Sequence, residues 1–270
     1  MKPEISELSY AFALTEDLVK RVGSPLISAP FFPSTAVEGK KGFGHDVKIS
    51  APSGSMFLQF KLSHCMSNAS AMEFHSGKFS QYVGGVKKPV YRMYLHALAK
   101  SRQTSLMLKL EQRHGNVHYV APLFHTAGEL TGHYLASRVV DESRFIKPSK
   151  IKKMPDQLEH FVSFRKTGKP FRFSNDPVEL EDGDSATSVV DALNREIQRG
   201  RTIEVVASEA LESMLAALDE ERNEGLWEVP WRQETVGRIR NLDIPILSKA
   251  SYVAYTYFDA QFLAFARHDG

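Results

Sequence analysis

The stretch "GHDVKISAPSGSMFLQFKLS", residues 44–63, decides which fold this chain is expected to adopt. Two runs of strand-forming residues flank "SAPSG", and this pattern predicts two strands joined as a hairpin. Side chains alternate along a strand, so the even-numbered residues of 56–62 share one wholly apolar face, whereas Gln59 and Lys61 share the opposite face. If both faces are covered, Gln59 and Lys61 need polar partners, and Asp46 on the neighbouring strand can supply one.

The whole chain has 270 residues, of which 42% are apolar, enough for one large domain or for one domain with an extension. No run of eighteen apolar residues occurs, and the opening "MKPEISELSY" does not resemble a secretory signal. We therefore expect a cytoplasmic protein without a membrane partner. The single cysteine, Cys65, excludes an internal disulfide and a Cys-rich zinc site, and we expect it to be buried or half-buried.

Charge is distributed unevenly along the chain. Residues 1–175 carry 25 Lys and Arg against 13 Asp and Glu, whereas residues 176–234 carry 5 against 16. Residues 74–110 contain seven basic side chains and no acidic one, and a second basic stretch covers residues 144–172. Such asymmetry is typical of a protein that binds a polyanion. The alternative is that the basic faces are solvated and balanced by the acidic segment in the fold.

Hydrophobic periodicity gives the coarse order of elements. A helix is expected from residue 5 to 22, where apolar residues recur from Leu8 to Val22 before Gly23. Further helices are expected over 91–112, 185–199 and 208–222, the last with Ser208 as N-cap. A strand is expected within 115–124 and a hairpin over 160–174 with Gly168 at its turn, while 250–266 fits a helix or a strand.

This order predicts an α/β (α+β) fold with two parts. The first, residues 1–175, is a core with a basic surface, and the second, residues 176–270, is an acidic and mainly helical extension. The acidic, Gly-containing segment 175–185 is the candidate linker.

Asp46, Gln59 and Lys61 make chemical sense together. An aspartate carboxylate and a glutamine carbonyl oxygen can hold a hard divalent cation such as Mg²⁺. The cation would polarise a phosphodiester and lower the pKa of a bound water, while Lys61 would orient that water and offset developing negative charge. These are the components of a phosphodiester hydrolase.

The same residues resemble a known superfamily. "GHDVKI" followed by "LQFKLS" is similar to the PD-(D/E)XK nuclease superfamily, in the Q-x-K variant of Mrr-like and related restriction endonuclease-like proteins. The resemblance covers roughly residues 5–125 and implies an αβββαβ core with Mg²⁺ or Mn²⁺ as cofactor. It also implies that Asp46 and Gln59 are metal ligands and that Asp46, Gln59 and Lys61 are catalytic.

Many of these nucleases use a further glutamate, and three are available here. Glu7 and Glu16 belong to the first expected helix, and Glu38 lies eight residues before Asp46. Glu38 is slightly preferred as the third metal ligand because it lies beside the expected hairpin.

The favoured hypothesis is therefore a Mg²⁺- or Mn²⁺-dependent endonuclease acting on double-stranded DNA, with a role in restriction or phage defence that follows from the resemblance alone. DNA contacts are predicted at basic residues of the acid-free stretch: Lys87, Lys88, Arg92, Lys100 and Arg102. The alternative is a non-catalytic nucleic-acid-binding or assembly subunit that retains the fold. RNA as substrate, a homodimer, and a protein partner bound by the acidic helices of 185–224 also stay open.

Other patterns are less informative. His114 and His118 have the spacing of a helical zinc pair, but Gly115 and Asn116 predict a turn between them. Ser53 and Ser55 lack a nucleophile-elbow motif, and no phosphate-binding glycine loop is present.

Overall fold

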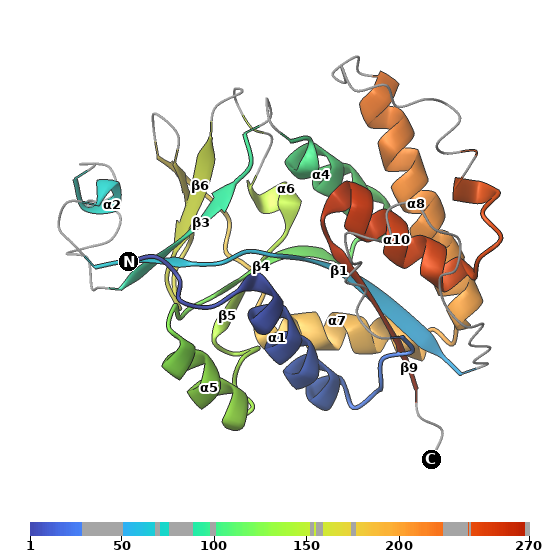
Figure 1. Ribbon diagram of the computed structural model, residues 1–270, viewed down its shortest axis with the longest axis horizontal. Helices are drawn as coiled ribbons and strands as arrows, with labels where there is room; N and C mark the ends of the chain where they lie inside the picture. Colours follow the sequence, from blue (N-terminus) through green and yellow to red (C-terminus); the bar gives the residue numbers. More distant parts are fainter. Residues whose placement is uncertain are drawn as a thin grey trace. The chain divides into compact units, whose positions relative to one another are not determined.

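The computed structural model describes most of the chain and shows a mixed α/β protein with two sheets (Figure 1). The described residues are 1–28, 51–67, 71–75, 89–97, 101–151, 154, 159–173, 177–223, 237 and 239–267.

Two compact units make up the chain, and each draws on several segments. The first unit contains Met1–Arg21, Phe60–Thr104 and His118–Val190. The second contains Val22–Gln59, Ser105–Val117 and Asp191–Gly270. The boundary expected between residues 175 and 176 therefore falls inside the first unit.

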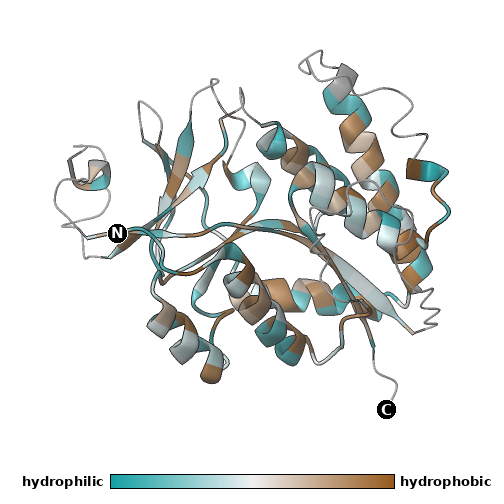
Figure 2. Ribbon diagram, in the orientation of Figure 1, coloured by the Kyte–Doolittle hydropathy of each residue, from teal (hydrophilic) through white to brown (hydrophobic). Residues whose placement is uncertain are grey.

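Helix α1, Glu7–Val22, opens the first unit as the sequence predicts, and Gly23 follows it with a φ of 67°. Its buried stripe passes through Tyr10, Leu14 and Leu18, whereas Leu8 and Phe12 are exposed. Figure 2 shows the mixture of hydrophobic and hydrophilic residues along this helix. The Ser6 hydroxyl accepts a hydrogen bond from the Ser9 backbone N–H, which satisfies one donor of the first turn.

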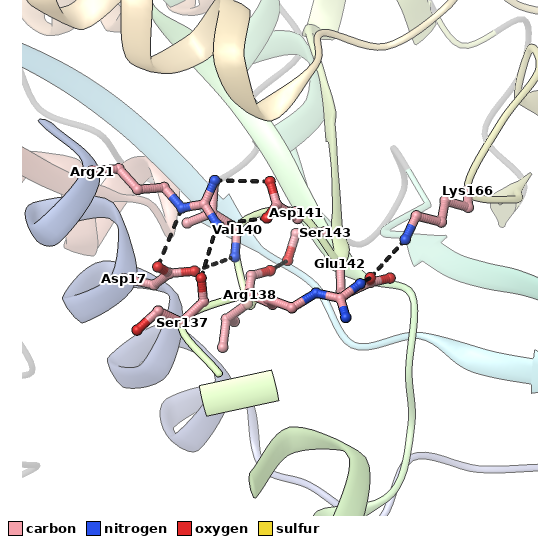
Figure 3. A network of polar contacts seen from close by, with 10 residues as sticks. Asp17, Arg21, Ser137, Arg138, Val140, Asp141, Glu142, Ser143 and Lys166 are labelled. Atoms are coloured by element: carbon pink, nitrogen blue, oxygen red, sulfur yellow. Dashed lines mark hydrogen bonds and ion pairs between the residues drawn. The ribbon is translucent and has the colours of Figure 1, made fainter. Parts of the chain in front are cut away.

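A polar network holds α1 against the chain that leads into strand β5, Ser143–Ile146 (Figure 3). The buried Asp17 carboxylate accepts from the Val140 N–H at 2.8 Å and from Arg21 Nε at 3.2 Å. The Arg21 guanidinium also binds both oxygens of Asp141, at 2.8 and 2.7 Å. A buried carboxylate in a helix is tolerated here because it accepts from a backbone amide and a guanidinium.

An antiparallel sheet of order β2-β3-β6-β7-β8 belongs to the first unit. Its strands are β2 (His64–Met66), β3 (Val90–Leu95), β6 (His160–Phe164), β7 (Phe171–Phe173) and β8 (Val178–Glu179).

Two of these strands test the expectations for this region. The β6–β7 hairpin is confirmed, with Gly168 at a φ of 87° between the strands. The helix expected over residues 91–112 is wrong at its start, because Val90–Leu95 is a strand and helix α4 begins only at Gln103. Tyr, Val and Met in this segment suit a pleated surface, which competes with the helical pattern. Cys65 is buried in β2, and burial raises the pKa of its thiol.

The remaining elements of the first unit are a second strand pair and three helices. Strand β4, Val117–Pro122, pairs antiparallel with β5 and is confirmed as the strand expected after Gly115. Helix α5, Ala127–Leu135, has no buried residue and begins with a capping box between Thr126 and Glu129. The short helices α2, Met72–His75, and α6, Pro148–Ile151, complete the set.

The second unit is built around the strand pair β1, Ser53–Phe60, and β9, Gln261–Ala266. The two strands run antiparallel, with Ser53 opposite Ala266 and Leu58 opposite Gln261. The segment expected to be a helix or a strand thus contains both, because helix α10, Ile246–Phe258, precedes β9. The strand expected at residues 45–49 lies outside the described residues.

Three longer helices belong wholly or largely to the second unit. They are α4 (Gln103–His114), α7 (Ala186–Gln198) and α8 (Ile203–Asn223). Helix α8 begins five residues before the expected N-cap Ser208, which is an exposed interior residue of the helix. Helices α8 and α10 lie side by side (Figure 1).

None of the helices in the described part of the chain combines the length and apolar character needed to cross a bilayer.

Candidate functional site

Strand β1 is buried along its entire length, so both of its faces are covered. On one face, a Cβ at Gly54 would lie 3.0 Å from Ile197 Cγ1 in α7, which leaves no room for a side chain. On the other, the Phe57 ring packs edge-on against His114 of α4, with centroids 4.8 Å apart. Because both faces of β1 are covered, Gln59 and Lys61 need polar partners.

Gln59 lies at the buried end of β1, with 1% of its surface exposed. Its Nε2 donates to Asp259 Oδ2 at 3.3 Å. The antiparallel register explains the meeting: Leu58 lies opposite Gln261, so the next residue of β1 comes beside the connection from α10 to β9. Asp259 is the first residue of that connection and is exposed.

Lys61 follows β1 directly and belongs to the first unit, where 7% of its surface is exposed. Its backbone N–H donates to the Val120 carbonyl oxygen at 2.9 Å, and its Nζ donates to Gln103 Oε1 at 3.0 Å. Gln103 is the first residue of α4 and is itself buried. The ammonium group is thus fixed by a neutral amide on a helix end.

The predicted acidic ligands Asp46 and Glu38 lie outside the described residues, as do the basic residues Lys87, Lys88 and Lys100. The two other glutamates considered belong to α1. Glu7 is exposed in its first turn, and Glu16 accepts from Tyr134 and from Lys20.

Arg92, which is predicted to contact DNA, instead binds a buried acidic residue of the first unit. Its Nε and Nη2 donate to the two oxygens of Glu73 at 2.8 and 2.5 Å, and Glu73 is fully buried. A guanidinium held in this way would leave a buried carboxylate without its counter-charge if it turned to a phosphate. Arg92 therefore does not suit the predicted role, whereas Arg102 is partly exposed before α4.

Several residues of the second basic stretch form ion pairs with acids of the first unit. Arg144 binds Asp182, Lys150 Nζ lies 2.9 Å from Asp184 Oδ1, and Lys169 Nζ lies 2.6 Å from Glu179 Oε1. Asp184 also binds His118 at 2.9 Å, and the His118 hydrogen bond and Lys150 hold the pKa of this carboxyl below its usual range. Acidic residues of the segment expected to be a linker thus pair with basic residues of 144–172.

Among the described residues, no group of three or more His, Cys, Asp and Glu side chains could hold a metal ion. His114 and His118 serve different contacts: His114 Nε2 lies 3.1 Å from Ser55 Oγ, and His118 contacts Asp184. The turn predicted between them is present, with Gly115 at a φ of 80°. A zinc pair is not formed.

A polar pocket of about 420 Å³ lies in the second unit beside the Ser55–His114 pair. Burial and the nearby Arg201 lower the pKa of His114 to about 4, and its Nδ1 is buried without a hydrogen-bond partner in the part of the chain described. A histidine that activates a serine needs an acceptor on its second nitrogen to stabilise the imidazolium. Ser55 and His114 therefore do not have the geometry of a nucleophile with its base. The lining residues are Ser55, Arg113, His114, Glu196, Arg199, Arg201, Val206, Glu209, Glu212 and Ser213.

Sequence reasoning missed Asp259 and Gln103 as the partners of Gln59 and Lys61. Asp259 is 200 residues away from Gln59 along the chain, and Gln103 is 42 residues away from Lys61. The only available signal was an aspartate directly after an aromatic-rich helix, which does not identify a partner strand.

The chain matches no protein-family model, no curated protein and no solved structure.

Proposed function

We propose that this protein is a Mg²⁺- or Mn²⁺-dependent nuclease that hydrolyses phosphodiester bonds of DNA with Asp46, Gln59 and Lys61, on a restriction endonuclease-like αβββαβ core. The observation that carries the proposal is the burial of Gln59 and Lys61 at the end of a strand whose other large side chains are apolar. Both polar groups bind further polar side chains, which fixes their positions.

Neither residue type is favoured at a buried position. Lysine is almost never fully buried unless it is paired, and burying an ammonium group or an amide costs free energy that its polar partners must offset. Methionine at 61 and leucine at 59 would fill similar volumes without that cost. Polar side chains kept in a core against this preference are typical of functional sites.

Each residue then has a defined task. Asp46 and Gln59 provide a carboxylate and an amide oxygen for the metal, with Glu38 as the preferred further ligand. When bound, the metal supplies polarisation of the phosphodiester and a more acidic water. Lys61 orients the attacking water and stabilises the negative charge that develops on the phosphate oxygens.

The proposed DNA contacts are Lys87, Lys88, Lys100 and Arg102. Arg92 is left out because its guanidinium binds Glu73. These contacts grip phosphates and do not distinguish DNA from RNA, so both are included in the test. Action in restriction or phage defence and assembly as a homodimer belong to the same proposal.

A second candidate function is a non-catalytic nucleic-acid-binding or assembly subunit. The neutral Gln59 and the coverage of both faces of β1 favour it, since a scaffold needs no open metal position. Exposed acids of α8, including Glu204, Glu209 and Glu212, would then bind a protein partner.

The test is cleavage of plasmid, linear DNA and RNA by the full chain with Mg²⁺, with Mn²⁺ and with EDTA. Lys61→Met and Asp46→Asn should each reduce the cleavage rate at least 100-fold. Lys169→Ala, which removes an exposed ammonium group of the first unit, is the matched control and should cleave normally.

Two results would contradict the nuclease. Cleavage retained in both site variants would assign the activity to another site. Metal-independent binding of DNA by the wild type, with no cleavage of any substrate, would favour the binding subunit.

A further inference from the structure

The end of helix α10 carries an aspartate where the backbone favours glycine. Asp259 follows Phe258 with φ 49° and ψ 39°, in the left-handed region. Its N–H donates to the Tyr255 carbonyl oxygen, and the N–H of Ala260 donates to the Ala254 carbonyl oxygen, both at 3.1 Å. This closure of a helix end is usually made by glycine, because a Cβ is unfavourable in that conformation.

The charge of Asp259 is also unfavourable at this place. The last carbonyl groups of a helix present partial negative charge, which repels a carboxylate. Glycine would remove both the conformational penalty and this repulsion. Asparagine, which adopts the left-handed conformation readily, would remove the repulsion.

The carboxylate instead lies where it meets the buried amide of Gln59. Asp259 Oδ2 is 3.3 Å from Gln59 Nε2, and Asp259 is exposed whereas Gln59 is not. Both residues are held by regular structure, Gln59 by β1 and Asp259 by the end of α10, and the β1–β9 register fixes one relative to the other. A cation arriving from solvent can therefore meet the carboxylate first and the amide behind it.

The two side chains form a suitable oxygen pair for a hard cation. The Gln59 amide offers Nε2 to the Asp259 carboxylate, and half a turn about its last torsion offers Oε1 instead. Carboxylate and amide oxygens are the ligands that Mg²⁺ and Mn²⁺ prefer.

We propose that Asp259 is a carboxylate ligand of the divalent metal, acting beside Gln59 in the second unit. The inference rests on the proposed metal-dependent function. It assigns a further acidic ligand that is distant in sequence from Glu7, Glu16 and Glu38.

The experiment measures metal binding directly on the full chain. Mn²⁺ is titrated into wild type, Asp259→Asn, Asp259→Gly and Asp243→Asn, and free Mn²⁺ is followed by electron paramagnetic resonance. Asp243 is an exposed aspartate of the same unit, close to the start of α10, and serves as the matched control. We expect both Asp259 variants to bind Mn²⁺ at least tenfold more weakly and Asp243→Asn to bind as the wild type does.

Thermal unfolding without metal separates ligand loss from misfolding. Asp259→Asn should melt close to the wild type, because asparagine adopts the left-handed conformation and its Oδ1 can still accept from the buried Gln59 Nε2, whereas Asp259→Gly removes this acceptor. In the wild type, Mn²⁺ should raise the melting temperature, and this increase should be absent in Asp259→Gly.

The outcomes distinguish this inference from the nuclease proposal. Mn²⁺ binding that depends on Asp259, without cleavage of any nucleic acid, supports the ligand and contradicts the nuclease. Metal-dependent cleavage with unchanged Mn²⁺ binding in both Asp259 variants supports the nuclease and overturns the ligand. A wild-type chain that binds no Mn²⁺ at millimolar concentration also overturns it.

Discussion

Two buried polar clusters, one in each unit, differ in how completely they are enclosed. In the first unit, Glu73 accepts from Arg92 at 2.5 and 2.8 Å and from Ser163 Oγ at 2.7 Å. Arg92 also donates to the Tyr94 hydroxyl at 3.0 Å, and its Cζ lies 4.0 Å from the centre of the Phe161 ring. In the second unit, Gln59 donates to the exposed Asp259 over the longer distance of 3.3 Å.

The difference separates polar groups that hold the fold from polar groups suited to chemistry. Arg92 and Glu73 satisfy each other in a closed and buried pair, so neither is available to a ligand. Asp259 is exposed to solvent and accepts from the neutral amide of Gln59. Burial of polar atoms alone does not identify a site, whereas a buried group facing an exposed carboxylate is a better indicator.

The largest effect is expected from breaking the closed pair. Arg92→Ala leaves the buried Glu73 carboxylate without its counter-charge, so the free energy of unfolding should fall by about 3 to 5 kcal/mol. Urea denaturation followed by circular dichroism measures it.

Replacing both partners is the control for that prediction. Arg92→Met with Glu73→Leu removes both charges together and should recover most of the lost stability. A double variant as unstable as Arg92→Ala would show that shape, and not charge, matters at this position.

A smaller effect is expected from the histidine that packs on β1. The pKa of His114 is about 4 in the folded chain, against an ordinary value of 6.5, because burial disfavours the imidazolium. His114 of the unfolded chain therefore binds a proton below pH 6.5, whereas His114 of the folded chain binds one only below about pH 4. The free energy of unfolding should fall by roughly 2 to 3 kcal/mol across this window as the pH decreases.

Carboxylates titrate in the lower part of the same window, so the measurement compares the wild type with His114→Gln at each pH. The difference in stability between the two chains should shrink as the pH falls from 7 to 4. Parallel pH profiles would show that folding does not lower the pKa of His114.

Gln59→Leu should change stability little, by less than about 1 kcal/mol in either direction, because the Asp259 carboxylate it leaves behind is exposed to water. Nuclease activity and Mn²⁺ affinity should nevertheless fall at least tenfold. Chemical denaturation and Mn²⁺ titration of the same preparation provide the two measurements. A loss of stability as large as that of Arg92→Ala would place Gln59 with the structural cluster.

The smallest effect is expected at the surface. Lys169 and Glu179 form an ion pair of 2.6 Å in which the lysine side chain is mostly exposed. Exposed pairs contribute little because water and salt screen them. Lys169→Ala should therefore leave the urea midpoint unchanged within error at both low and high salt. A clear shift of the midpoint would show that the ion pair between Lys169 and Glu179 contributes to stability.

The sequence predicts those features that depend on neighbours along the chain. Helix α1 ends at Gly23, the β6–β7 hairpin turns at Gly168, and β1 buries its apolar face because these patterns are local. Strand β3 was mistaken for helix because its residues fit both periodicities over a short window.

The partners of the polar pair depend on contacts between distant segments. Nothing near Gln59 in the sequence indicates that β9 pairs with β1 or that Asp259 then meets the amide. The ion pairs of the second basic stretch also depend on distant segments, because Arg144, Lys150 and Lys169 bind acids that follow them in the chain. Charge along a sequence does not give charge at a surface.

The pairing of β1 with β9 also limits when the second unit can fold during synthesis. Gln59 and Asp259 are separated by 200 residues, so at ribosomal rates β1 exists for about 10 to 40 s before its partner strand is made. During that time the edge of an apolar strand, "SGSMFLQF", is open to pairing with other chains. The second unit therefore folds only after β9 has been synthesised, and its yield should depend on chaperones and on expression temperature more than that of a chain built from local contacts.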